Sequence, residues 1–271
     1  MKMFDALSSD LTDRILAHLG CARKSPSIRY LNQLIHAYIR RVPWESVSRI
    51  VKRYATVETA QCPRWPAEFW ADALSCGTGG TCFENNLAFF ALLTALGFTG
   101  YLTINDMPSQ RACHTAIIIS GQQQKHLVDV AIPLHCALPF YRDKVTKRST
   151  LFHHYTIRPL GDSQFAIQRS HHPKRDVFTL LDSPVPSEVY AAAVEGDYEP
   201  TGYFLDRVII VKVIDDRLWR FSSAEKPYKL EAFTKTSRQE ILLAPDRLSY
   251  LLAQHFGIAE EKVAAALSHV V

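Results

Sequence analysis

The sequence lacks the features that would assign it to a membrane or secreted protein. No run of about 18 uninterrupted apolar residues occurs, so no membrane span is expected. The N-terminal segment MKMFDALSSDLTDR carries acidic residues where a signal peptide has its apolar run, and a cytoplasmic protein is therefore expected. No internal repeat or low-complexity stretch stands out. The apolar fraction of 47% and the length of 271 residues predict a globular protein of two or three structural units.

Patterns typical of metal sites and of nucleic-acid binding are also missing. The six cysteines include no CxxC pair, and the adjacent histidine pairs at 153–154 and 171–172 cannot share a helical face, so no metal site is expected. The net charge of +4 is mild, and no nucleic-acid module accompanies the basic clusters at 144–148 and 169–175. These clusters are expected to be solvated or to meet an anionic ligand such as a nucleotide-bearing cofactor.

The first third of the chain has helical periodicity. In SIRYLNQLIHAYIRRVPWE the apolar residues recur at three- and four-residue steps, which predicts a helix that Pro43 ends near Arg41. The clearest helix is predicted to begin at Cys82 and to end at Gly97, which suits a left-handed cap. Before it, the glycines of GGTCFENN are expected to supply backbone freedom.

After Gly97 the hydrophobic period changes from helical to alternating. Strands are predicted at 99–105, 114–120, 126–132, 152–158, 165–169 and 177–181. They indicate a β-barrel or strongly curved sheet, followed by a turn-rich candidate linker at 195–202, a further hairpin and two amphipathic helices. The prediction is a multi-domain α+β protein, with a helical domain at 1–97, a β-barrel domain at 98–195 and a C-terminal α/β domain at 196–271.

Cys82 could be a buried filler, a metal ligand, half of a disulfide or a nucleophile. A thiol at a helix N-terminus faces unpaired N–H groups and the positive end of the helix dipole, which stabilise a thiolate. This feature alone is weak evidence for a nucleophile, because buried structural cysteines are common. A nucleophilic cysteine also needs a base and a group that orients the base.

His114 and Asp129 are candidates for that base and that orienting group. The odd-numbered face of 117–119 and the even-numbered face of 128–132 are wholly apolar, so they should be buried together. This register needs an even-length turn, for instance one centred on Gln122-Gln123, and it places His114 and Asp129 on one face. Each residue alone could have a structural role, but the set of Cys82, His114 and Asp129 favours catalysis.

These segments resemble a known family. GGTCFENNLAFFALLTALGF, HTAIII and HLVDVAIP resemble the arylamine N-acetyltransferases, whose signature is Arg-Gly-Gly-x-Cys-x-Glu followed by a His and an Asp in successive strands. LIHAYIRRVPWESV and YLLAQHFGI resemble the segments that precede and follow them in that family. The resemblance implies a helical bundle, a β-barrel and an α/β lid, with a papain-like triad of Cys82, His114 and Asp129 between the first two.

The resemblance also implies ping-pong acyl transfer. Cys82 would take an acyl group from a CoA thioester, normally acetyl-CoA, and pass it to a small-molecule amine such as an arylamine or hydrazine. His114 would accept the thiol proton and Asp129 would hold its ring. An oxyanion site is expected at the amides of Cys82 and Ala131. No permanently bound cofactor is implied, and no residue is assigned to binding CoA.

The sequence departs from the family pattern at several positions. Thr78 stands at the signature arginine, and Ala131 and Pro133 add bulk where the family keeps glycine. Trp44 is expected to be structural rather than to contact substrate. Glu84 is expected to favour the first helical turn rather than to form a salt bridge.

Alternatives remain open at this point. The changes at 78 and 131–133 also suit an amide synthase or acyltransferase that takes its acyl group from a carrier-protein thioester. Papain-like proteases and transglutaminases use the same three residue types, so a cysteine hydrolase is a third possibility. A non-catalytic binding module is disfavoured, because all three triad positions are filled.

Overall fold

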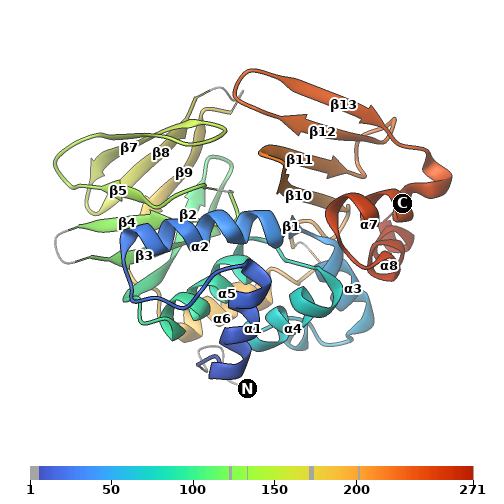
Figure 1. The fold of residues 1–271 in the computed structure, drawn as a ribbon, viewed down its shortest axis with the longest axis horizontal. Helices are drawn as coiled ribbons and strands as arrows, with labels where there is room; N and C mark the ends of the chain where they lie inside the picture. The colour runs from blue at the N-terminus through green and yellow to red at the C-terminus, as the bar shows by residue number, and fades with distance from the viewer. Residues whose placement is uncertain (1–5, 122–123, 133, 171–173, 201, 271) are drawn as a thin grey trace.

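The computed structural model describes residues 6–121, 124–132, 134–170, 174–200 and 202–270. Helices fill the lower half of the molecule in Figure 1, below a curved eight-stranded sheet and a separate five-stranded sheet that is flanked by two helices. The predicted α+β class is therefore confirmed. Within the described ranges, no helix combines the length and apolarity needed to cross a membrane.

Among the described residues, six helices make up the lower half of the molecule. They are α1 (Ser9–Leu19), α2 (Ile28–Arg41), α3 (Val47–Ala55), α4 (Pro66–Cys76), α5 (Cys82–Ala95) and α6 (Ser187–Gly196), with a short 3₁₀ turn at Thr59–Gln61. As predicted, α2 buries its apolar stripe and ends at Arg41, just before Pro43. Helix α5 also matches the prediction, since Gly97 follows it with a φ of +85° and the Phe98 amide bonds back to the Leu93 carbonyl.

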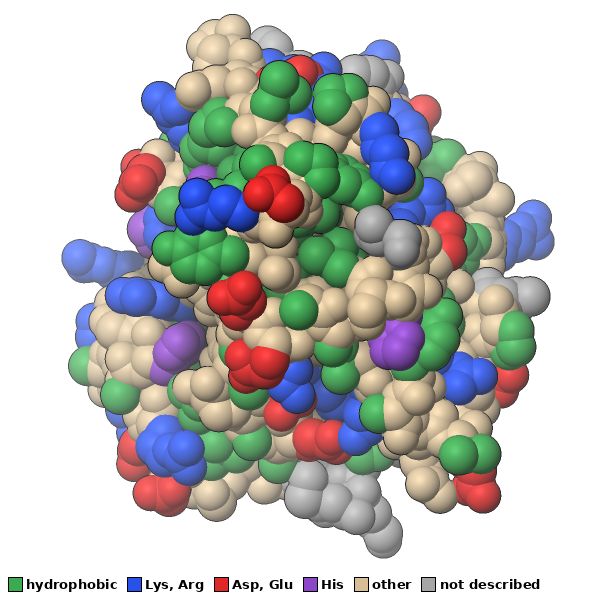
Figure 2. Space-filling view, turned by 90° about the vertical axis from the view of Figure 1, so that its right-hand side faces the viewer, with side chains coloured by type: hydrophobic (Ala, Val, Ile, Leu, Met, Phe, Trp, Pro, Cys, Tyr) green, Lys and Arg blue, Asp and Glu red, His purple; other side chains and the backbone are tan. Residues whose placement is uncertain are grey.

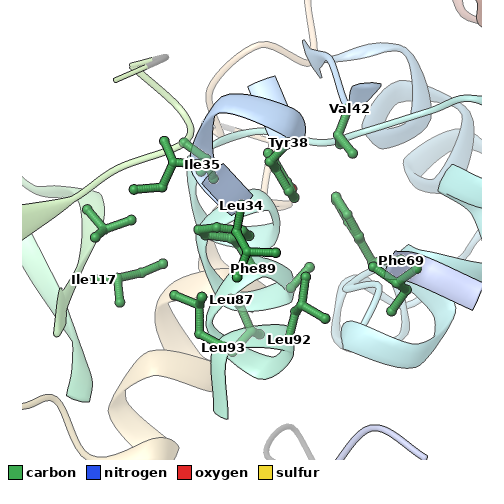
Figure 3. Packing of buried hydrophobic residues seen from close by; sticks show 14 of the residues in the cluster. Leu34, Ile35, Tyr38, Val42, Phe69, Leu87, Phe89, Leu92, Leu93 and Ile117 are labelled. Carbon is green, nitrogen blue, oxygen red and sulfur yellow. The ribbon is translucent and has the colours of Figure 1, made fainter. Parts of the chain in front are cut away.

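Helix α5 is the centre of the largest core. Its apolar residues pack against α2, α4 and one face of the large sheet, as Figure 3 shows for Leu87, Phe89, Leu92 and Leu93. Leu92 and Leu93 are fully buried, and truncating either to alanine would cost about 2–5 kcal/mol of stability. This packing holds the N-terminus of α5, and Cys82 with it, at a fixed place beside the sheet.

The eight-stranded sheet is nearly closed into a barrel. Its strands are β2 (Gly100–Met107), β3 (Gln110–Ser120), β4 (Lys125–Val128), β5 (Leu138–Phe140), β6 (Thr146–Ser149), β7 (His154–Gly161), β8 (Gln164–Arg169) and β9 (Asp176–Leu181). The order is β5-β4-β3-β2-β9-β8-β7-β6, and its two edge strands β5 and β6 lie in contact. The short strands β5 and β6 were not predicted.

The β3–β4 hairpin has the predicted register. Ile117 pairs with Val128 and Ser120 pairs with Lys125, so four residues connect the strands. Gln122 and Gln123, where the turn was predicted to be centred, lie outside the described residues. As predicted, Ile117 and Ile119 are buried together with Val128 and Val130, in the core that the helices share. Ile132 of the same predicted face is only partly buried and packs against the barrel core instead. The strand predicted at 126–132 is wrong beyond Val128, because the chain turns there and the Leu134 amide bonds back to the Asp129 carbonyl.

The first strand of the five-stranded sheet is far in sequence from the other four strands. The sheet consists of β1 (Trp44–Glu45), β10 (Ile209–Ile214), β11 (Arg217–Ser222), β12 (Lys229–Phe233) and β13 (Arg238–Leu242), in that order, beside α7 (Leu248–Phe256) and α8 (Glu260–Val270). The predicted β10–β11 hairpin and the two terminal helices are confirmed, whereas β12 and β13 were not predicted. Pairing of Trp44 with Val211 ties this sheet to the helices.

Helix α6 was not predicted, because the sequence indicated only strands between 98 and 195. Its sequence SEVYAAAVEG is rich in alanine, the strongest helix former. Tyr190 and Val194 pack into the helical core, and the Tyr190 hydroxyl donates a hydrogen bond of 2.8 Å to the Phe83 carbonyl. Helix α6 thus returns the chain from the barrel to the N-terminal end of α5.

Candidate active site

Cys82 is the first residue of α5, and the turn before it is closely packed. A side chain on Gly79 would overlap the Pro43 carbonyl, and one on Gly80 would meet the Glu84 carboxylate. Neither glycine has a positive φ. The pair is therefore needed for close approach of the chain rather than for the backbone freedom that the sequence suggested.

A buried ion pair links the chain segment before Cys82 to the segment after it. The Arg64 guanidinium donates to the Gly79 carbonyl at 2.5 Å and to the Glu84 carboxylate at 2.7 Å. Burial alone would raise the pKa of Glu84, but the charge of Arg64 and bonds from Arg64 and Tyr198 lower it. The expectation that Glu84 only favours the helix turn is therefore wrong. Arg64 brings its guanidinium to this turn, although Thr78 stands at the signature arginine position.

Glu45 anchors the other side of the same turn. Its carboxylate accepts hydrogen bonds from the Gly79 amide at 2.9 Å and from the amide and hydroxyl of Ser48. Burial raises the pKa of Glu45, and the nearby Arg64 limits the rise. No sequence pattern marked Glu45 or Arg64 as supports of Cys82, because both contacts join segments distant along the chain.

His114 and Asp129 form a buried pair beside α5. The Nε2 atom of His114 lies 2.6 Å from Oδ2 of Asp129, and the two residues are 5% and 0% exposed. Burial alone would lower the pKa of His114, but the Asp129 carboxylate, together with a hydrogen bond to Cys82, raises it to about 10. The Asp129 carboxylate thus stabilises the protonated form of the imidazole, which suits a residue that takes a proton from Cys82.

Asp129 is held by the turn that follows β4. Its Oδ1 atom accepts hydrogen bonds from the amides of Ala131 at 2.9 Å and Ile132 at 3.3 Å, and from Nδ2 of Asn86 at 3.2 Å. The Ala131 amide therefore points to Asp129, and it is not free for the oxyanion role that was expected of it. Pro133, the other residue of this departure from the family pattern, lies outside the described residues.

Cys82 and His114 face a common cavity of about 260 Å³. Cys82 is half-buried, with its Sγ 3.8 Å from the Cys113 carbonyl oxygen. The lining residues are Trp44, Thr81, Cys82, Met107, Ser109, Cys113, His114, Ala131, Ile132, Asp197, Tyr203 and Phe204. The structure thus brings together the three predicted site residues and opens the sulfur to a small molecule. Trp44, expected to be purely structural, lines the cavity.

One wall of the cavity, which the sequence did not reveal, is formed by Asp197, Tyr203 and Phe204. Phe204 has a φ of +60°, and its ring packs edge-on against Trp44 at 5.0 Å. Tyr203 lies beside Phe204, with their ring centroids 5.9 Å apart. In the sequence, these residues lie in a turn-rich stretch that looks like an ordinary surface loop. Only the fold shows that they line the cavity at Cys82.

A larger cavity of about 730 Å³ lies in the C-terminal part, between the β12–β13 region and helices α7 and α8. Apolar side chains gather in the upper half of the molecular face on that side (Figure 2). No cysteine or histidine lines this cavity among the described residues.

The basic cluster at 144–148 lines neither cavity, and residues 171–173 of the other cluster lie outside the described residues. Within the described chain, no group of three His, Cys, Asp or Glu side chains could hold a metal ion.

The fold is shared by arylamine N-acetyltransferases of known structure. The enzyme from Salmonella typhimurium superposes with a TM-score of 0.80 at 16% identity, over 97% of this chain and 99% of its own. The Mycobacterium marinum enzyme in complex with CoA gives a TM-score of 0.80 at 16% identity, over 96% and 99% of the two chains. A Bacillus cereus enzyme with a Cys-His-Glu catalytic triad gives 0.76 at 17% identity, over 93% and 100%.

Sequence comparison agrees with this likeness. No curated protein matches the sequence. The model of a protein family described as N-acetyltransferase, however, matches residues 27–264, which is most of the chain. The chain therefore belongs to the arylamine N-acetyltransferase family and is an enzyme of that kind.

Proposed function

We propose that this enzyme moves an acetyl group from acetyl-CoA to a small-molecule amine, such as an arylamine or hydrazine, through an acetyl-cysteine at Cys82. The observation that carries the proposal is the 2.6 Å contact between His114 and Asp129 at the cavity that exposes the Cys82 sulfur. CoA bound to the Mycobacterium marinum enzyme supports CoA as the carrier of the acyl group.

The first half-reaction transfers the acyl group to the enzyme. His114 takes the Cys82 proton, giving a thiolate and an imidazolium that Asp129 stabilises. The thiolate attacks the thioester carbonyl, the carbon–sulfur bond to CoA breaks, and the imidazolium returns its proton to the leaving CoA thiolate. The Cys82 amide, at the first position of α5, has no intrahelical carbonyl partner and supports the developing oxyanion.

The second half-reaction transfers the acyl group to the acceptor. The amine attacks the acetyl-cysteine carbonyl, His114 takes a proton from the attacking nitrogen, and the carbon–sulfur bond to Cys82 breaks. The products are the acetylated amine and the thiolate–imidazolium pair that begins the next cycle. The cavity of about 260 Å³ suits one small ring better than a peptide, which favours amine acetylation over proteolysis.

Intact mass spectrometry after incubation with acetyl-CoA tests the proposal. We expect the protein mass to increase by one acetyl group, with one equivalent of CoA released. Cys82→Ser should abolish the thioester adduct, whereas Cys76→Ser, at the end of α4 and outside the cavity, should leave it unchanged. An acetyl-carrier-protein substrate in a parallel sample separates the two donors. No adduct from acetyl-CoA would contradict the proposal.

A further inference from the structure

The cavity beside Cys82 has one acidic side chain in a mostly apolar lining. Trp44, Met107, Ile132 and Phe204 contribute apolar surface, and Asp197 is the one carboxylate among the described lining residues. A carboxylate in such a lining is costly to desolvate, so its presence needs a partner in the protein or in the ligand. A bound acceptor therefore meets one carboxylate, Asp197, and one imidazole, His114, in addition to cysteine and tyrosine side chains.

Asp197 is held at the cavity by its own loop and by a buried arginine. A side chain on Gly202 would overlap the Asp197 carbonyl, so the loop after α6 folds closely around this residue. Its Oδ2 atom lies 2.6 Å from Nη1 of Arg49, and the two side chains are 13% and 1% exposed. Burial raises the pKa of Asp197, and the Arg49 charge opposes this rise.

The ion pair with Asp197 does not use all the hydrogen-bond donors of Arg49. Its Nε and Nη2 atoms are buried without a hydrogen-bond partner, and its guanidinium stacks 4.4 Å from the centre of the Tyr198 ring. Arg49 itself is absent from the cavity lining, whereas Asp197, its ion-pair partner, lines the cavity. The cavity therefore presents a negative group that is paired with a buried positive one.

We infer that Asp197 selects the acceptor: the cavity favours amines that carry a second, cationic or hydrogen-bond-donating group, and disfavours amines that carry a carboxylate there. This inference rests on the proposed function, since the acceptor is the substrate of the second half-reaction. The aromatic side chains accept the ring of the acceptor, and the Asp197 carboxylate accepts N–H groups at its other end. A carboxylate in that place would face Asp197 with like charge.

Loss of the Asp197 charge should shift the preference toward carboxylate-bearing acceptors rather than weaken binding in general. Without it, Arg49 remains next to residue 197 as an unpaired cation with donors to spare. A carboxylate-bearing acceptor then gains a partner, and a cationic one meets repulsion. A merely structural Asp197 would instead affect every acceptor alike.

A matched series of acceptors tests the inference. Para-aminobenzamidine, para-aminobenzamide and para-aminobenzoate share ring and nucleophile but carry a cationic, neutral or anionic group. For the wild-type enzyme with acetyl-CoA, we expect kcat/KM to fall in that order. In Asp197→Asn, which keeps the size of the side chain, the benzamidine-to-benzoate ratio should fall by about tenfold or more, equivalent to about 1.4 kcal/mol of differential transition-state binding.

Controls separate this inference from the proposed function and from misfolding. Glu199→Gln removes one charge from the same loop, outside the cavity, and should leave the ratio unchanged. Acetylation of Cys82 by acetyl-CoA, measured first, reports whether each variant is folded and active. A wild-type preference for the benzoate, or an equal loss for all three acceptors in Asp197→Asn, would overturn the inference alone. Wild-type Cys82 that resists acetylation would overturn the proposed function as well.

Discussion

Replacing Arg64 by methionine tests how Cys82 is held. Arg64 and Glu84 are 1% and 2% exposed, and the fully buried Glu45 lies in the same network. Methionine keeps much of the length of the side chain but removes the charge, which leaves two buried carboxylates without their cation. Breaking a buried ion pair in this way costs about 3–5 kcal/mol of folding free energy. That is a large share of the roughly 5–15 kcal/mol that stabilises a typical domain.

Urea unfolding gives the stability change, and stopped-flow CoA release gives the rate of Cys82 acetylation. Because Arg64 bonds to Gly79 and Glu84 on either side of Cys82, acetylation should slow even where the variant is folded. The double variant Arg64→Met with Glu84→Gln removes a buried charge and should recover part of the lost stability.

The partly exposed pair of Lys52 and Glu68 is the matched control. Its side chains are 28% and 42% exposed, so Lys52→Met should cost only about 0–1 kcal/mol. An Arg64→Met variant that loses no more stability than Lys52→Met would refute the role assigned to the buried network. The same conclusion would follow if the double variant were less stable than the single one.

Two further predictions concern the His114–Asp129 pair. Asp129→Asn should lower the acetylation rate roughly 100- to 10,000-fold, because an amide cannot stabilise the imidazolium; single-turnover CoA release measures this, and a loss below about tenfold would contradict it. The folded-state pKa of His114 is about 10, above its ordinary 6.5, so its contribution to stability is fully present below pH 6.5 and is lost as the pH rises through about 10. Urea midpoints across this range should fall with pH in the wild type and change less in Asp129→Asn, and equal slopes would argue against the pair.

Much of the fold follows from hydrophobic pattern alone. The stripe of α2, the glycine that ends α5 and the register of the β3–β4 hairpin depend on local periodicity, which the sequence displays directly. The same register places His114 near Asp129, so these site residues were accessible to sequence reasoning. The exact end of β4 could not be predicted, because it depends on the Asp129 side chain, which accepts hydrogen bonds from the two amides of the turn that follows.

The supports of the site come from contacts that no local pattern encodes. Arg64 and Glu84 are separated by 20 residues, and Arg49 and Asp197 by 148. A charged residue in a polar segment is usually solvated, so burial of these pairs becomes visible only when the helices and the loop after α6 are packed together. The division into domains at 1–97, 98–195 and 196–271 stays a prediction.

The most direct test of the account is a chase of the isolated acetyl-enzyme. Wild-type protein is acetylated with acetyl-CoA, freed of donor by gel filtration, and mixed with an arylamine while mass spectrometry follows both protein and product. We expect the acetyl group to leave Cys82 and to appear on the amine in equal amount, faster than it is lost to water. An adduct that persists while the steady-state reaction proceeds, or that yields only acetate, would contradict an acyl-cysteine intermediate on the path to the amide.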